Sequence, residues 1–287
     1  MHARDVDKAT PYFIHQGPIP ETLYRYRSLT SRDQYRNVIS EILNEQVYLA
    51  SMKSLNDPDE GRLRIEFKKD TSAIYSYFYS SEIERLGHVR ASRLAADRVA
   101  ELVSTGYRLP EGVARIMRAE FGRRIRIACF TTLPTNFLMW ANYATLCSHA
   151  NNIGHAGICI EYAVSEDWRL HPFGPVTYSD VVPVYDPTTR DESALVKTYY
   201  MKSPEWSGES EWRITYVITG DLRNDADANR HAMLRLPQSV RAVIFGMNTP
   251  LNIREKIIRD VRRVAPRIQF RYLHQDQHLV AREIRNL

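Results

Sequence analysis

Three charged side chains alternate in the segment Glu209-Ser-Glu-Trp-Arg213, which follows a Trp-Ser-Gly turn and opens a stretch typical of a β-strand. Because alternate residues of a strand lie on the same face, we expect Glu209, Glu211 and Arg213 to point the same way. Two carboxylates beside an arginine can have different pKa values, and one of them can then act as a base. The same spacing is also compatible with a ladder of surface ion pairs.

A second polar motif lies in the turn-rich stretch 54–61. Asp57 precedes a proline, which favours an extended backbone, and Asn56 can hydrogen-bond its own main chain. The motif is therefore either a self-stabilising turn or the polar rim of a site. Asp57, Asp59 and Glu60 could instead hold Mg²⁺, as in a metal-dependent nuclease or phosphodiesterase. Because a second, well-spaced acidic cluster is missing, we predict no metal site.

Aromatic and imidazole side chains provide further candidates. Trp140 and Tyr143 lie three residues apart on a predicted helix and therefore share one face. Core packing is the favoured role for Trp140, whereas Tyr143 carries a hydroxyl that needs a partner when it is buried. His149 and His155 lie in a polar loop, where single histidines are more often surface residues than catalytic ones.

The composition is that of a globular protein, with 44% hydrophobic and 25% charged residues in a chain of 287. The net charge is +5, and arginine dominates the basic residues, with 32 Arg against 7 Lys. Arginine suits phosphates and carboxylates, so a nucleotide or nucleic-acid partner is compatible with this bias. The arginines are dispersed, with local clusters only at 123–126 and 259–271, and a solvated surface is the better explanation.

The cysteines indicate a reducing compartment, because Cys129, Cys147 and Cys159 are sparse and odd in number. Their spacing is not that of a zinc site, and apolar neighbours predict that Cys129 and Cys159 are buried structural thiols. No apolar stretch approaches the roughly 18 residues that span a bilayer, and the N-terminus lacks the apolar core of a signal peptide. We therefore expect a cytoplasmic protein without membrane contact.

Strand and helix patterns occur in pairs and runs instead of regular βαβ alternation, which indicates an α+β fold. We expect a mixed, largely antiparallel central sheet with flanking helices. Residues 1–22 are predicted to be an extended lead-in and 23–287 a single domain, with a helical insertion at 70–124 made of two helices that break near Gly106 and Pro110. Rossmann and P-loop glycine motifs are absent. Strands are predicted at 23–27, 47–51, 125–131, 156–162, 176–178, 181–185, 212–218, 240–245, 268–273 and 279–284, and further helices at 32–45, after Pro134, at 190–203 and at 252–264.

Five segments support a resemblance to a known family. They are Leu-Tyr-Arg-Tyr-Arg-Ser at 23–28, Asn-Asp-Pro-Asp-Glu-Gly at 56–61, Cys-Phe-Thr at 129–131 with Leu-Met-Trp-Ala-Asn-Tyr-Ala at 138–144, Gly-Ile-Cys-Ile-Glu at 157–161, and Glu-Ser-Glu-Trp-Arg at 209–213. Together, and in this order, they resemble the DUF2971 family of bacterial proteins over nearly the whole chain. The resemblance implies a fold and a set of shared polar residues, but no assigned reaction. Members commonly have a histidine where this chain has Asn142.

The Glu-x-Glu pattern is also similar to the corresponding element of ADP-ribosyltransferases. In that superfamily the second glutamate binds the nicotinamide ribose and stabilises an oxocarbenium-like transition state, and the first can orient an acceptor. The similarity implies that Glu211 is catalytic, that Glu209 is secondary and that NAD is the substrate. A first-strand arginine or histidine and an aromatic residue near the nicotinamide complete such a site. The residues implied to bind NAD are Tyr26, Arg27, Asn56, Trp140, Tyr143 and Arg213.

Three classes of function remain open. The favoured class is an NAD-dependent, ADP-ribosyltransferase-like enzyme, for which the DUF2971 resemblance implies a role in anti-phage defence or as a toxin. The second class is a nucleic-acid-binding protein or metal-dependent nuclease, motivated by the arginines and the loop 57–60, whose binding would fall steeply with salt. The third class is a non-enzymatic interaction module, in which the shared polar residues only support the fold.

Overall fold

The computed structural model of the chain describes residues 15, 17–148, 151–189, 193–218, 233–275 and 282–287. Most of the predicted N-terminal lead-in therefore lies outside the described residues, as does His149. Among the helices of the described ranges, none combines the length and the apolar character that a membrane span requires.

A nine-stranded sheet forms the centre of the described structure, and neighbouring strands are antiparallel except for the pair β15–β16. The predicted α+β class with a mixed, largely antiparallel sheet is therefore confirmed. The strand order is β17 (Arg282–Asn286), β16 (Gln269–Gln275), β15 (Val240–Phe245), β8 (Ile158–Ala163), β1 (Thr22–Arg27), β5 (Ile125–Thr131), β13 (Glu211–Val217) and β9 (Phe173–Pro175), with β3 (Ala50–Ser51) also paired to β5.

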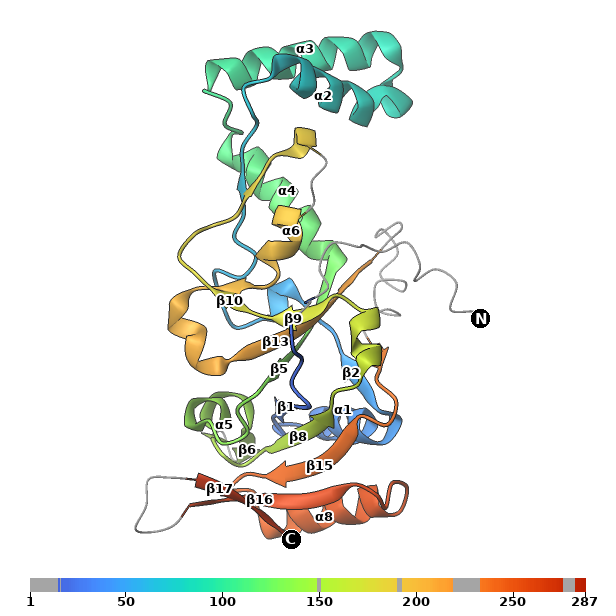
Figure 1. Cartoon of the computed structure of the whole chain (residues 1–287), viewed down its shortest axis with the longest axis vertical. Coiled ribbons are helices and arrows are strands. Elements are labelled where there is room, and N and C mark those ends of the chain that lie inside the picture. The colour runs from blue at the N-terminus through green and yellow to red at the C-terminus, as the bar shows by residue number, and fades with distance from the viewer. Residues whose placement is uncertain (1–14, 16, 149–150, 190–192, 219–232, 276–281) are drawn as a thin grey trace.

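Two amphipathic helices cover one face of this sheet (Figure 1). Helix α1 (Arg32–Asn44) begins after Ser31, whose hydroxyl accepts a hydrogen bond from the Gln34 amide, as predicted for its N-cap. Helix α8 (Leu251–Arg262) connects the parallel strands β15 and β16. The apolar sides of both helices pack with alternate residues of β1 and β8 in one core cluster. The short helix α5 (Phe137–Tyr143) packs on the opposite face, against Tyr26 of β1.

The segment 70–124 is helical, as predicted, but it contains three helices instead of two. These are α2 (Thr71–Leu86), α3 (His88–Ser104) and α4 (Glu111–Arg124). The additional break lies at Gly87, whose φ of +74° ends α2, because this backbone conformation interrupts a helix and favours glycine. Figure 1 shows the paired helices α2 and α3 at the end of the molecule that lies far from α8.

Short elements connect the large ones. The predicted helix at 190–203 is wrong in extent, because the described part contains only α6 (Ser193–Thr198) and then β12 (Met201–Lys202), which pairs with β10 (Thr177–Tyr178). The predicted strand 47–51 is divided between β2 (Gln46–Tyr48) and β3. The remaining elements are β4 (Arg64–Ile65) paired with β11 (Val184–Tyr185), β14 (Met233–Arg235) paired with β2, β6 (Leu146–Ser148) paired with β7 (Asn151–Ile153), and the 3₁₀ helices η2 (Met52–Ser54), η3 (Glu166–Leu170), η4 (Pro187–Thr189) and η5 (Pro204–Glu209).

The central sheet divides between β1 and β5. Strand β1 pairs with β8 along its whole length, but it pairs with β5 at one position, Tyr24 opposite Thr131. Strand β5 in turn pairs with β13 at all seven of its residues. The two halves of the sheet therefore separate beyond Tyr24, and the opening between them is where the candidate site lies.

Candidate functional site

A cavity of about 250 Å³ lies at the fork between β1 and β5. Its walls come from β1, β5, the start of β13, helix α5 and the loop that follows η2. These segments lie far apart in the chain, and together they contain most of the residues predicted for the site. The predicted residues that line the cavity are Tyr26, Arg27, Asn56, Tyr143, Glu209, Glu211 and Arg213.

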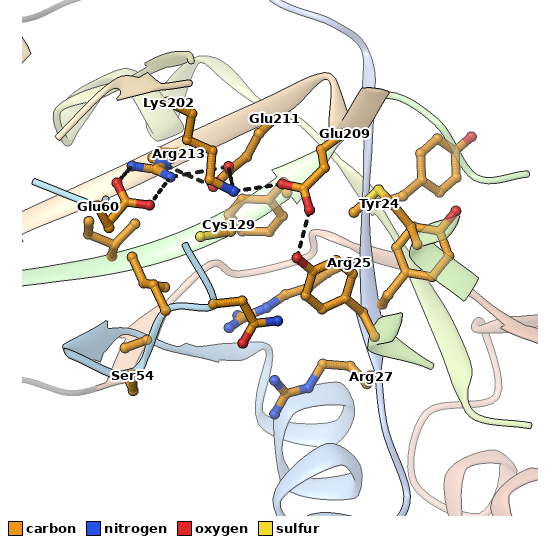
Figure 2. Close-up of a pocket in the computed structure, with 18 residues that line it drawn as sticks. Tyr24, Arg25, Arg27, Ser54, Glu60, Cys129, Lys202, Glu209, Glu211 and Arg213 are labelled. Atoms are coloured by element: carbon orange, nitrogen blue, oxygen red, sulfur yellow. Dashed lines mark hydrogen bonds and ion pairs between the residues drawn. The ribbon is translucent and has the colours of Figure 1, made fainter. Parts of the chain in front are cut away.

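The Glu-x-Glu-x-Arg motif forms one wall of the cavity (Figure 2). Strand β13 begins only at Glu211, so Glu209 belongs to η5 and does not lie on the strand, contrary to the prediction. Ser210, in the left-handed conformation with φ 44° and ψ 53°, separates the two elements. The three charged side chains nevertheless gather at one place, because Lys202 joins both glutamates.

Arg213 is the centre of this wall. Its side chain is completely buried, and its Nε lies 2.7 Å from Glu211 Oε1. Its Nη1 and Nη2 donate to the two carboxylate oxygens of Glu60 at 2.6 and 2.9 Å. Nη1 also donates to the Tyr199 carbonyl oxygen at 2.7 Å. A guanidinium with these partners is fixed in place, so Arg213 is suited to positioning carboxylates and has little capacity left for a ligand.

Lys202 is a site residue that the sequence did not reveal. Its Nζ lies 2.6 Å from Glu209 Oε2 and 2.8 Å from Glu211 Oε2. Burial alone would lower the pKa of Lys202, but the carboxylates of Glu211 and Glu209 outweigh burial and raise it. The lysine is therefore a permanent cation here. Its position at the end of a predicted helix carried no signal of this role.

Glu211 is held in its ionised form. Burial would raise its pKa, but the charges of Arg213 and Lys202 outweigh burial and lower the pKa to about 2. A carboxylate with so low a pKa is a weak base. With a side chain only 3% exposed, Glu211 is also less accessible than Glu209, which is 12% exposed. If one of the two glutamates meets a substrate, the geometry favours Glu209.

Tyr143 orients Glu209 from helix α5. Its hydroxyl donates to Glu209 Oε1 at 2.6 Å, so both oxygens of this carboxylate are held, one by Tyr143 and one by Lys202. Burial and the hydrogen bond to Glu209 raise the pKa of Tyr143, while the nearby Asn56 amide works in the opposite direction. Tyr143 is therefore a protonated donor. Helix α5 begins after Asn136, whose side chain caps it by accepting from the Met139 amide.

Two arginines of β1 form the opposite wall. Arg25 and Arg27 share the carboxylate of Glu41, with Arg25 Nη1 3.4 Å from Oε1 and Arg27 Nε 3.0 Å from Oε2. Among the described residues, no hydrogen-bond acceptor contacts the terminal nitrogens of Arg27, whose side chain is 23% exposed. Burial lowers the pKa of Arg27 despite Glu41, so additional negative charge would be favourable there. Figure 2 shows Arg27 on the side of the cavity away from Lys202 and Arg213.

Of the two aromatic residues Trp140 and Tyr26, only Tyr26 lies in the cavity wall. Trp140 is completely buried, donates from Nε1 to the Pro134 carbonyl oxygen at 2.8 Å and is not part of the cavity wall. Tyr26 lines the cavity, but its hydroxyl donates to the Leu133 carbonyl oxygen at 2.6 Å and its ring packs edge-on against Trp140. Asn142 is exposed and lies outside the cavity wall.

The acidic loop does not form a metal site. Glu60 lines this cavity and also a neighbouring one, Asp57 lines the neighbouring one, and Asp59 pairs with Arg62 at 3.3 Å. In the described ranges, no group of three His, Cys, Asp or Glu side chains is placed to hold a metal ion. The three acids instead have different partners, since Asp57 accepts from the Asp59 amide, Asp59 pairs with Arg62 and Glu60 pairs with Arg213.

Two further residues differ from expectation. His155 is not a surface residue, because it is 6% exposed and its ring packs 4.6 Å from that of Phe137, outside the cavity wall. Cys159 is buried as predicted, whereas Cys129 lines the cavity beside Glu211. Burial and the neighbouring Glu211 carboxylate raise the pKa of Cys129, so it is a neutral thiol and a poor nucleophile.

Comparison with known proteins adds nothing to these observations: no family model matches the chain, and neither the curated proteins nor the solved structures include a significant match.

Proposed function

We propose that the protein is an ADP-ribosyltransferase-like enzyme that cleaves the bond between nicotinamide and ribose in NAD. The observation that carries the proposal is the separation of charge across one cavity. On the β13 side, the carboxylates of Glu60, Glu209 and Glu211 exceed the cations of Lys202 and Arg213 by one negative charge.

On the β1 side, Arg25 and Arg27 exceed the single carboxylate of Glu41 by one positive charge. NAD has the complementary distribution, because its pyrophosphate is anionic and its nicotinamide ring is cationic. The phosphates would meet Arg27, and the nicotinamide ribose would meet Glu209. Tyr26 and Asn56 also line the cavity.

The chemistry requires a carboxylate close to the anomeric carbon. When the bond from this carbon to the nicotinamide nitrogen breaks, its electron pair stays on the ring and neutralises the pyridinium charge. Positive charge develops on the ribose, and an ionised, preorganised carboxylate stabilises it. Glu209 fits this role because Tyr143 and Lys202 hold it in place and it remains the more exposed glutamate. Water or another acceptor then adds to the anomeric carbon and releases a proton.

The size of the cavity limits how NAD would bind. Its volume of about 250 Å³ is below the range of about 300–1,000 Å³ that is usual for pockets of drug-sized ligands. We therefore place the nicotinamide riboside inside it, the phosphates against Arg27 and the adenosine part outside the cavity. In this arrangement Trp140 does not contact NAD.

The family resemblance forms part of the proposal. Four of the five segments that resemble the DUF2971 family contribute residues to the cavity, as expected if the shared residues serve one site. A role in anti-phage defence or as a toxin would follow from this membership. The three cysteines are free, which fits the proposed cytoplasmic location. A metal-dependent nuclease is not favoured, since among the described residues Asp57, Asp59 and Glu60 do not form a group placed to hold a metal ion.

The proposal is tested by the release of nicotinamide from NAD, measured by chromatography with and without cell lysate or nucleic acid as acceptor. We expect release by the wild type and a loss of about 100-fold or more for Glu209→Gln, because a preorganised charge is removed. Glu205→Gln is the matched control, since Glu205 is an exposed glutamate in the same 3₁₀ helix. Absence of release under every acceptor condition would refute the proposal, as would equal rates for Glu209→Gln and wild type. Absence of release from the wild type, together with reduced stability of Glu209→Gln, would support the interaction module instead.

A further inference from the structure

The two edges of the central sheet differ in their capacity to pair with another strand. At one edge, β9 is three residues long, and its outward-facing residue Pro175 has no N–H group to donate. At the other edge lies β17, which pairs with β16 on one side and with no described strand on the other (Figure 1). Strand β17 has the sequence Arg-Glu-Ile-Arg-Asn, without proline or glycine. An edge of this kind is a template for one more strand.

The register of β16 and β17 shows which main-chain groups of the edge face outward. The Leu287 N–H donates to the Phe270 carbonyl oxygen at 3.1 Å, and bonded pairs alternate with unbonded pairs along an antiparallel ladder. The main chain at positions 283 and 285 therefore bonds towards β16. The N–H and C=O groups that face away from β16 are those of Arg282, Ile284 and Asn286.

The side chains of β17 are complementary to a reversed copy of the same strand. Glu283 and Arg285 lie on one face, on either side of Ile284, and Arg285 Nε donates to Glu283 Oε1 at 2.6 Å. Their side chains are 56% and 45% exposed. If two copies run antiparallel and centre on Ile284, Glu283 of each copy lies opposite Arg285 of the other. These positions would form a non-hydrogen-bonded pair, in which side chains of neighbouring strands approach most closely.

We propose that β17 is a dimerisation edge, at which a second copy of the chain adds its own β17 antiparallel about a two-fold axis through Ile284. Each outward N–H then donates to a carbonyl oxygen of the other copy, and the interface closes at two copies. An unrelated strand need not carry the matching charges, so the alternation of Glu283 and Arg285 favours a second copy.

The strength of this dimer is limited by its size. One added strand gives a smaller interface than the about 1,200 Å² at the lower end of stable complexes, so we expect weak and reversible association. The proposal does not depend on NAD cleavage, because no residue of β17 lines the first cavity.

The test is sedimentation velocity of the full chain over a range of concentrations up to about 1 mM. Asn286→Pro removes an N–H that faces away from β16, and Asn286→Ala, which keeps this N–H, is its matched control. Glu283→Arg and Arg285→Glu each place like charges opposite one another in a dimer of identical copies. A mixture of these two variants restores opposite charges, because one copy carries only arginine and the other only glutamate at the two positions.

We expect wild type and Asn286→Ala to dimerise with the same Kd, and Asn286→Pro, Glu283→Arg and Arg285→Glu each to weaken association by about tenfold or more. The mixture of Glu283→Arg and Arg285→Glu should form a heterodimer about as tightly as the wild type forms its homodimer. Urea unfolding checks that each variant is folded, and the mixing experiment does not require Asn286→Pro.

Three results would overturn the proposal. A wild type that stays monomeric at every concentration would leave the edge to a foreign strand. A dimer with the same Kd in folded Asn286→Pro would use another surface. A mixture of the two charge variants that associates no better than either variant alone would exclude the antiparallel register centred on Ile284.

Discussion

The buried carboxylate of Glu211 should control how stability responds to acid. Arg213 and Lys202 lower its pKa from the ordinary 4.5 to about 2 in spite of burial. A carboxyl whose pKa is lower in the folded state stabilises the fold above the unfolded-state pKa, and this contribution is lost as the pH falls towards the folded-state value. The difference between 4.5 and about 2 corresponds to about 3 kcal/mol at neutral pH and about 1 kcal/mol at pH 3.

The measurement is urea unfolding of wild type and Glu211→Gln between about pH 7 and pH 3. We expect the variant to be less stable at neutral pH, because Arg213 and Lys202 lose a buried partner. The gap between the two free energies of unfolding should narrow by about 2 kcal/mol on acidification. Burial raises the pKa of Glu60, so its contribution has the opposite sign, and loss of the Glu211 charge removes part of this increase in the variant.

A matched control and a clear refutation exist for this experiment. Glu84→Gln removes an exposed carboxylate from α2 and reports the effect of losing one surface charge. The difference in free energy of unfolding between wild type and Glu211→Gln is compared across the whole pH range. A difference that stays constant would show that Glu211 is not held ionised by Arg213 and Lys202.

Three further predictions concern residues around the cavity. Tyr143→Phe removes the donor to Glu209 Oε1, so we expect nicotinamide release to fall by about tenfold, with at most about 1.5 kcal/mol lost on urea unfolding; an unchanged rate would contradict the proposed orienting role. Trp140→Phe removes the donor to Pro134, which should cost about 1–3 kcal/mol by urea unfolding and leave the rate per folded molecule unaltered; a specific loss of activity would return Trp140 to the site. Gly157→Ala places a methyl group 2.8 Å from Ala144 Cα, so we expect a loss of about 1–3 kcal/mol by urea unfolding, and an unchanged midpoint would refute the close approach.

Patterns of local spacing predicted the fold class and the shared direction of two charged side chains in the candidate site. Alternation correctly placed Glu211 and Arg213 on one face of β13, because side-chain direction in a strand depends only on parity. The prediction that Glu209 lies on the same strand face was wrong, because the strand begins at Glu211 and Ser210 before it has a left-handed backbone conformation. Local spacing is reliable only inside an element, and the start of an element is set by tertiary contacts.

The partners of the site could not be predicted in this way. Glu60 lies 153 positions from Arg213, and no short-range pattern connects them. Lys202 and Arg25 acquire their roles from carboxylates that the fold brings close to them. The division of the sheet between β1 and β5 depends on strand register, which a single sequence does not specify for strands so distant in the chain.

The wide sequence separation of the groups that Arg213 holds has a consequence for the timing of biosynthesis. One guanidinium joins Glu60, the Tyr199 main chain and Glu211, so the cavity wall cannot close until β13 has left the ribosome and the chain has folded back upon its early part. Nascent or truncated polypeptides that end before Arg213 would lack these contacts. The proposed cleavage of NAD would therefore be withheld throughout most of translation.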